Sequence, residues 1–181
     1  MVWGFRRPAP PNREGGAAVK KVWLIKGTTV HLTGDSILKA RAAARHRHEV
    51  NASNTRGAGT NYDYHLKGTI GEQAQIQLMG LKRGPECSTS WSTNPDIWES
   101  NPHIEVKNGA AVARKLHFNA NALWVVFGAE NDDNPYVLRL KRMAMGRDVL
   151  EHAIVPLWLP RAANENWEIP DLITEIEVTV S

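Results

Sequence analysis

The stretch NPDIWESNPHIEVKN, residues 94–108, constrains the fold of this chain most, because it sets charged residues among apolar residues typical of strands. Asp96 stands at the start of one strand-like segment, and Glu105 and Lys107 lie in the next. Ionised groups inside a folded protein are costly unless they are paired, hydrogen-bonded or bound to a metal. The stretch therefore predicts a buried hairpin that carries either a salt bridge at its rim or a metal site.

The residue types in this hairpin favour a particular chemistry. In a strand IEVKN, Glu105 and Lys107 share one face, and a short turn brings Asp96 beside Glu105. Two converging carboxylates make a hard-oxygen site suited to Mg²⁺ or Mn²⁺, and the backbone carbonyl of Val106 supplies a further oxygen. The side chain of Lys107 would orient an attacking water, deprotonate it as the neutral amine, or stabilise a charged transition state as the ammonium. Hydrolysis of a phosphodiester requires this collection of parts.

The segments around the hairpin predict a mixed α/β fold. From residue 62 onward their order is helix, strand, strand, helix, strand, strand, which favours a mixed sandwich over an all-parallel sheet. In chain order we expect a hairpin of two strands over 20–32, helices over 37–50 and 64–80, the hairpin over 96–108, a short helix over 110–118, strands over 122–129 and 136–142, a helix over 142–155 and a last strand over 172–180. Trp23, Trp124 and Trp158 lie in apolar runs and are predicted core residues.

Charge divides the chain unevenly. Residues 1–60 contain eleven Lys and Arg against three acidic residues, whereas residues 61–181 contain eleven against sixteen. A basic first third joined to an acidic remainder indicates a polyanionic partner that one part holds and the other acts on. We therefore expect a flexible arm over 1–18, a basic hairpin-helix extension over 19–60 and a catalytic core over 61–181. The alternative is a basic segment that serves solubility or docks on the acidic half.

Other features limit the setting. The single cysteine, Cys87, excludes an intrachain disulfide and a thiolate zinc cluster. No stretch approaches the length of a membrane span, and residues 1–30 lack the apolar segment of a signal peptide. These observations predict a cytoplasmic protein that does not associate with a membrane.

The motif resembles that of the PD-(D/E)xK nuclease superfamily, the fold of many restriction endonucleases, junction resolvases and exonucleases. The signature stands as Pro95-Asp96, eight intervening residues, then Glu105-Val106-Lys107, and the resemblance covers roughly residues 62–142. It implies a restriction endonuclease-like mixed sheet flanked by helices, here with a basic N-terminal extension. It also implies that Asp96, Glu105 and Val106 hold the catalytic Mg²⁺, with Mn²⁺ as a substitute.

The resemblance extends the site by one residue, since the family often adds a glutamate on the helix before the hairpin. Glu72 takes that position, as a catalytic residue and an outer or second-metal ligand. The implied substrate is DNA, branched DNA included, and a junction resolvase would act as a homodimer with two sites. The basic residues expected to hold the nucleic-acid backbone are Lys39, Arg41, Arg45, Arg47, Arg56 and Lys115.

Several alternatives stay open from the sequence. Glu105 and Lys107 are also compatible with a surface ion pair on one strand face, and Glu72 with a solvated residue near a helix N-terminus. At the level of function, the alternatives are a non-catalytic nucleic-acid-binding or assembly protein on a nuclease fold, a restriction-type enzyme and an RNA-directed nuclease.

Overall fold

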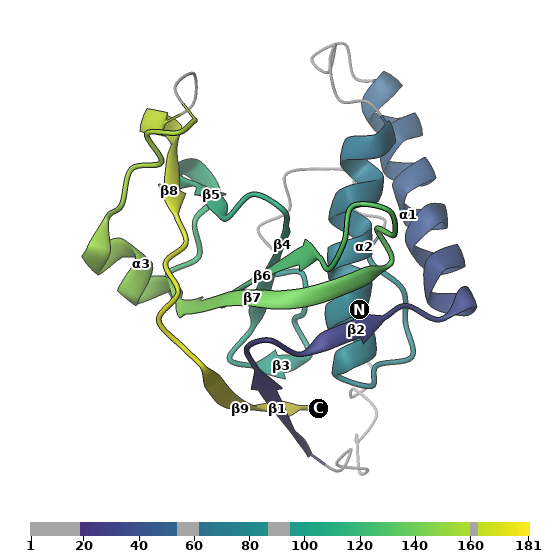
Figure 1. Cartoon of the computed structure of the whole chain (residues 1–181), viewed down its shortest axis with the longest axis horizontal. Helices are drawn as coiled ribbons and strands as arrows, with labels where there is room; N and C mark the ends of the chain where they lie inside the picture. Colours follow the sequence, from purple (N-terminus) through teal and green to yellow (C-terminus); the bar gives the residue numbers. More distant parts are fainter. Residues whose placement is uncertain (1–18, 54–61, 87–94, 160–162) are drawn as a thin grey trace, which may run out of the picture.

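A four-stranded mixed sheet forms the centre of the protein, as the computed structural model shows for residues 19–53, 62–86, 95–159 and 163–181 (Figure 1). Its strand order is β2 (Thr29–His31), β7 (Val137–Met145), β6 (Leu123–Ala129) and β4 (Ile104–Asn108). β4 runs parallel to β6, and the other neighbours are antiparallel. The predicted mixed α/β class is confirmed. The predicted arm over 1–18 and Arg56 lie outside the described residues.

β6 is the buried strand of this sheet, as its apolar sequence predicted. Leu123, Val125 and Phe127 point to one face and join a hydrophobic cluster with α2 (Tyr62–Leu78). Trp124 and Val126 point to the other face and join a second cluster. Because side chains alternate along a strand, two separate cores form on the two faces of one strand.

One long helix, α2, covers the first of these faces, and a second long helix, α1, packs against α2 (Figure 1). α1 (Gly34–Ser53) begins after Thr33, whose Oγ1 accepts a hydrogen bond of 3.2 Å from the backbone N–H of Ser36, a typical N-cap. α2 ends at Leu78, and Gly80 follows with a φ of +70°, which ends helices at little steric cost. Figure 1 shows α1 lying beside α2 on the side of α2 away from the sheet. Both predicted helices are thus present.

α2 packs directly on β4, the strand that carries the predicted catalytic residues. The side-chain amide of Asn108 donates a hydrogen bond of 2.8 Å to the carbonyl of Lys67. A Cβ at Gly71 would lie 2.7 Å from the Cβ of Asn108, so only glycine allows this approach without a shift. This close contact sets the distance between α2 and β4.

A second sheet joins the two ends of the chain and corrects one prediction. β1 (Lys20–Ile25) pairs with β9 (Glu175–Val180), which also pairs with β3 (Ser100–Asn101). The predicted hairpin over 20–32 is wrong, because β1 and β2 belong to different sheets. The turn at Gly27 sends β1 to the last strand and β2 to β7, so both strands find distant partners. The hydrophobic core consequently includes residues of the segment 20–53 together with residues of the segment 62–180.

The region after β4 corrects two further predictions. The segment 110–118 forms β5 (Val112–Arg114) and a 3₁₀ turn η1 (Lys115–His117), because β5 pairs with β8 (Asn166–Glu168). The segment 142–155 is helical only in α3 (Gly146–His152), since Met143 and Ala144 continue β7 and are buried opposite β6. A second 3₁₀ turn, η2 (Ala163–Glu165), precedes β8.

The tryptophans divide differently from the prediction. Trp124 is 3% exposed and belongs to the core, as expected. Trp23 and Trp158 are each 55% exposed, so both predictions are wrong. Trp23 stands on β1, opposite Glu177 on the neighbouring strand β9, and Trp158 lies outside regular secondary structure. In the described part of the chain, no helix combines the length and apolar character needed to span a membrane.

Candidate metal centre and catalytic site

The candidate site lies at the edge of β4 that is not paired with β6. Ile97 and Ile104 exchange two backbone hydrogen bonds of 3.0 and 3.1 Å. The predicted hairpin over 96–108 is therefore only partly confirmed, because a single antiparallel bridge pairs with β4 and Asp96 does not begin a strand. One step farther along the edge, an oxygen of the Asp96 carboxylate accepts a hydrogen bond of 2.7 Å from the N–H of Val106. The Asp96 side chain therefore takes the place that the next residue of a pairing strand would occupy at this edge of β4.

This hydrogen bond also indicates the direction of the Val106 carbonyl oxygen. In a strand, the N–H and the C=O of one residue point to the same edge, as the paired exchange between Ile97 and Ile104 illustrates. The carbonyl of Val106 therefore points to the edge at which Asp96 is held. The carboxylate and the carbonyl proposed as metal ligands from the sequence are thus on the same side of the strand.

Glu105 and Lys107 project from one face of β4, as predicted. In the parallel pairing they lie opposite Trp124 and Val126, so they share the face that α2 does not cover. The Nζ of Lys107 lies 5.2 Å from the centroid of the Trp124 ring, within the range of a cation–π contact. This contact favours one position of the lysine over the ring.

The pKa of Glu105 is raised from 4.5 to about 8. Burial is the largest cause, and the negative charge of Asp96 is the next; Lys107 opposes them, and Glu72 adds a smaller repulsion. Two carboxylates that repel each other in a partly dry environment share an excess of negative charge. A divalent cation between them would remove that excess.

Glu72 approaches the same group of charges from α2. Its side chain is buried, and its pKa is raised from 4.5 to about 7, mainly by burial and then by the charge of Asp96. Arg47 on α1 opposes this effect through two hydrogen bonds of 2.7 Å, one to each carboxylate oxygen. Lys107 also lowers the pKa of Glu72 through its charge, so the charges of Asp96 and Lys107 act on both Glu72 and Glu105.

Arg47 has a part in the site that the sequence did not indicate. We expected it to contact a nucleic-acid backbone, but its guanidinium group holds Glu72 and also donates hydrogen bonds of 2.6 and 3.1 Å to the carbonyl of Glu86. The residue therefore ties α1 to α2 and to the chain that leads toward Asp96. Nothing in the run ILKARAAARHRHEV separates this arginine from its neighbours, because only the packing of α1 on α2 selects it.

The other basic residues lie in different surroundings. Lys39 pairs with Asp35 at 2.7 Å and also contacts the carbonyl of Lys82. Arg41 donates to the hydroxyl of Tyr136 and is exposed. Arg45 is likewise exposed, and with Arg41 it borders a shallow hollow between α1 and α2. The Nζ of Lys115, in η1, lies 3.7 Å from the centroid of the Trp167 ring, away from α1.

The residues present fit a hard cation that keeps several water ligands. Asp96, Glu105 and the carbonyl of Val106 supply oxygens only, which is the donor type that Mg²⁺ prefers. Glu72 is already neutralised by Arg47, so direct coordination by Glu72 would require exchange of that partner. Among the residues that the structure describes, no three His, Cys, Asp or Glu side chains are grouped so that they could hold a metal ion together, and this applies to Glu72, Asp96 and Glu105 as well.

No protein-family model, curated protein or solved structure matches this chain. Functional conclusions therefore rest on its residues and their geometry.

Proposed function

We propose that this protein is a metal-dependent endonuclease that hydrolyses phosphodiester bonds in DNA. The observation that carries the proposal is the Asp96 carboxylate, held at the free edge of β4 by the N–H of Val106 and close enough to Glu105 to raise its pKa. The order Pro95-Asp96, Glu105-Val106-Lys107, after a helix that carries Glu72, adds the PD-(D/E)xK pattern as support.

In this proposal Asp96, Glu105 and the carbonyl of Val106 hold Mg²⁺ or Mn²⁺. When bound, the ion would polarise the scissile phosphate and lower the pKa of a water ligand. Lys107 orients the attacking water and stabilises the extra negative charge of the transition state, since its ammonium stands on the same strand face as Glu105. Glu72 completes the negative group as an outer ligand, and Arg47 keeps it in place.

The proposed substrate is held by basic residues outside this centre. Arg41 and Arg45 are exposed along α1, and Lys39 lies two residues before Arg41, so a phosphate backbone can approach this helix. Arg56 and Lys115 remain further candidates. A branched DNA substrate, cut by a homodimer in the manner of a junction resolvase, is the subtype that we favour, and a cytoplasmic location fits it.

One observation favours a second candidate function, a nucleic-acid-binding protein that does not cut. Both carboxylate oxygens of Glu72 already accept hydrogen bonds from Arg47. In a protein that does not cut, Glu72 would serve only to hold α1 and α2 together. The intact set Asp96, Glu105 and Lys107 favours the nuclease over this candidate.

A cleavage assay separates the two candidates. Linear duplex, single strand, a flap, a four-way junction and RNA are incubated with the protein and Mg²⁺, with and without EDTA. We expect metal-dependent cleavage that is lost in Asp96→Asn and Lys107→Ala. Glu175→Gln, which removes an exposed carboxylate on β9, serves as the matched control and should cut normally. Binding without cleavage of any substrate would establish the second candidate, and cleavage by Asp96→Asn at the normal rate would refute the proposed site.

A further inference from the structure

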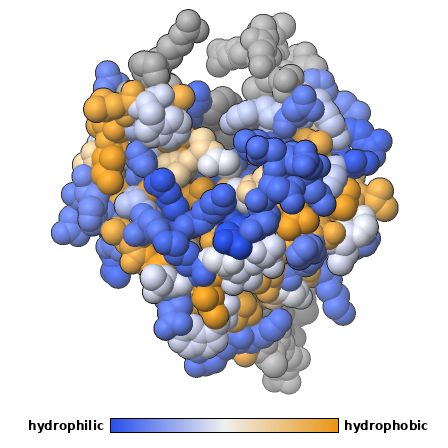
Figure 2. Space-filling model, in the orientation of Figure 1, coloured by the Kyte–Doolittle hydropathy of each residue, from blue (hydrophilic) through white to orange (hydrophobic). Residues whose placement is uncertain are grey.

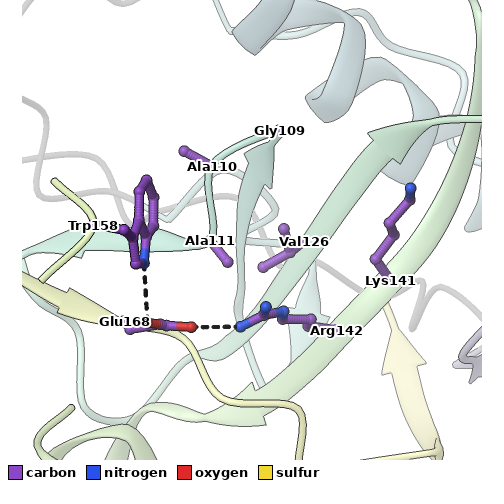
Figure 3. Close-up of a pocket in the computed structure, with 8 residues that line it drawn as sticks. All are labelled: Gly109, Ala110, Ala111, Val126, Lys141, Arg142, Trp158 and Glu168. Atoms are coloured by element: carbon purple, nitrogen blue, oxygen red, sulfur yellow. Dashed lines mark hydrogen bonds and ion pairs between the residues drawn. The ribbon is translucent and has the colours of Figure 1, made fainter. Parts of the chain in front are cut away.

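A hollow of about 350 Å³ opens on the sheet face that carries Glu105 and Lys107. We call it the Trp158 hollow; its lining residues are Gly109, Ala110, Ala111, Val126, Lys141, Arg142, Trp158 and Glu168 (Figure 3). Val126 is the residue that pairs with Lys107 across the two parallel strands. Gly109 follows Lys107 by two residues, so the hollow begins about 7 Å beyond the proposed catalytic lysine along the strand direction.

The Trp158 ring is held in a defined orientation although it is more than half exposed. Its indole N–H donates a hydrogen bond of 3.1 Å to Glu168, and Arg142 donates one of 2.9 Å to the other oxygen of the same carboxylate. Arg142 in turn also donates to the carbonyl of Ile169. The charge of Glu168 is thereby neutralised, and its pKa is lowered by the hydrogen bond from Arg142. Because a hydrogen bond holds the indole N–H, the exposed face of the Trp158 ring has a fixed orientation and can stack on another aromatic ring.

A β-bulge supplies the hollow with a cation. The register between β6 and β7 shifts between Val126 and Phe127, which leaves Lys141 as the extra residue of β7. Lys141 and Arg142 therefore both line the hollow, which consecutive residues of a regular strand would not do. The side chain of Lys141 passes over Gly128, because a Cβ added to Gly128 would lie 2.8 Å from the Cε of Lys141. Figure 3 shows Lys141 and Trp158 on opposite sides of the hollow.

This combination points to a ligand with an aromatic face at one end and negative charge at the other. A nucleotide unit has both, since any base stacks on an indole ring and its phosphate pairs with an ammonium group. In Figure 2 hydrophobic residues lie at the upper left, where Figure 1 places β5 and β8, and also at the right and in the lower part of this face, with hydrophilic residues between them.

We propose that the Trp158 hollow binds one unstacked nucleotide of the substrate strand, next to the phosphate that is cut, with its base on Trp158 and its phosphate at Lys141. The proposal rests on the proposed nuclease function and deepens it. A base can enter such a hollow only when it is not paired or stacked in a duplex. The hollow therefore predicts preference for a strand with a free end, a branch or a gap over uninterrupted duplex.

Scanning with abasic sites tests this proposal. Single-stranded oligonucleotides that lack one base at successive positions are titrated against the Asp96→Asn protein, which does not cut. We expect one position at which the missing base weakens binding, between about fivefold and a hundredfold. In the Asp96→Asn, Trp158→Ala protein that penalty should disappear. Trp23→Ala is the matched control, because Trp23 is exposed to the same extent on another sheet and should leave the penalty unchanged.

The outcomes separate this proposal from the proposed function. An abasic penalty that depends on Trp158 in a protein that never cuts DNA supports the hollow and overturns the nuclease. Metal-dependent cutting with an abasic profile that Trp158→Ala does not alter supports the nuclease and overturns the hollow. Lys141→Ala provides a second readout: we expect weaker binding of every oligonucleotide and a smaller dependence of affinity on salt, with the position of the abasic penalty retained.

Discussion

Replacement of Glu105 by glutamine should stabilise the metal-free protein, and the effect should depend on pH. Folding raises the pKa of Glu105 from 4.5 to about 8, through burial first and the charge of Asp96 second. Between these values the folded protein retains a proton that the unfolded chain has released. The free energy of unfolding therefore falls as pH rises through this range. Glutamine has no proton to lose, so Glu105→Gln escapes this decline.

The size of the effect follows from the shift in pKa. At 1.36 kcal/mol per unit, the cost of the ionised side chain has a ceiling of about 5 kcal/mol above pH 8. Glu105 is not fully buried, and solvent screens part of the repulsion, so we expect a stabilisation of about 2 kcal/mol. For a chain of this size that corresponds to a rise in Tm of about 4–8 °C. At pH 5 Glu105 is protonated in the folded protein, and the rise should largely vanish.

Thermal melts with EDTA at pH 5 and at pH 8.5 measure this difference. Glu175→Gln, the exposed control, should melt like the wild type at both pH values. Addition of Mg²⁺ at pH 8.5 should raise the Tm of the wild type and have little effect on Glu105→Gln, because the cation removes the same repulsion. If Glu105→Gln melts at or below the wild-type temperature at pH 8.5, the carboxylates of the site do not repel each other as argued.

Two further substitutions test how the site is held together. Arg47→Ala leaves the Glu72 carboxylate buried without its partner and should lower the free energy of unfolding by about 3–5 kcal/mol. Addition of Glu72→Gln should recover part of this loss, as measured by denaturant melts. Gly71→Ala forces a Cβ against Asn108 and should lower the free energy of unfolding by about 1–3 kcal/mol. Cleavage should fall as well, because α2 shifts relative to β4. Unchanged stability would mean that α2 and β4 can move apart without cost.

The sequence predicted the parts of the fold that depend on local patterns. The helix that ends before Gly80, the buried strand β6 and the bridge between Ile97 and Ile104 each follow from apolar spacing and turn residues within a short window. Pairing between distant segments has no such signal. β1 and β2 read as a hairpin, yet β1 pairs with a strand about 150 residues away. β5 read as a helix because its strand partner, β8, lies far along the chain.

The candidate site shows the same limit. The spacing of Asp96, Glu105 and Lys107 was sufficient to predict one cluster, because a short hairpin leaves few other arrangements. No local pattern distinguishes Arg47 from Arg45 two residues earlier, although the first is bound to Glu72 and the second is exposed. Trp158 was taken for a core residue because apolar residues flank it. Trp158 is instead 55% exposed, and its indole N–H donates a hydrogen bond to Glu168, a contact that the sequence does not reveal.

The edge of β4 explains why this site would stand where it does. An edge strand presents backbone groups that would otherwise invite pairing with another chain. Asp96 covers one of them, and in doing so it brings a carboxylate to the side of the strand on which the Val106 carbonyl lies. The concentration of acids costs stability, which Arg47 partly restores from α1. The basic first third of the chain therefore contributes to the electrostatics of the acidic centre. If α1 were displaced, Glu72 would lose the support of Arg47, and the proposed contacts of Arg41 and Arg45 with DNA would be lost with it.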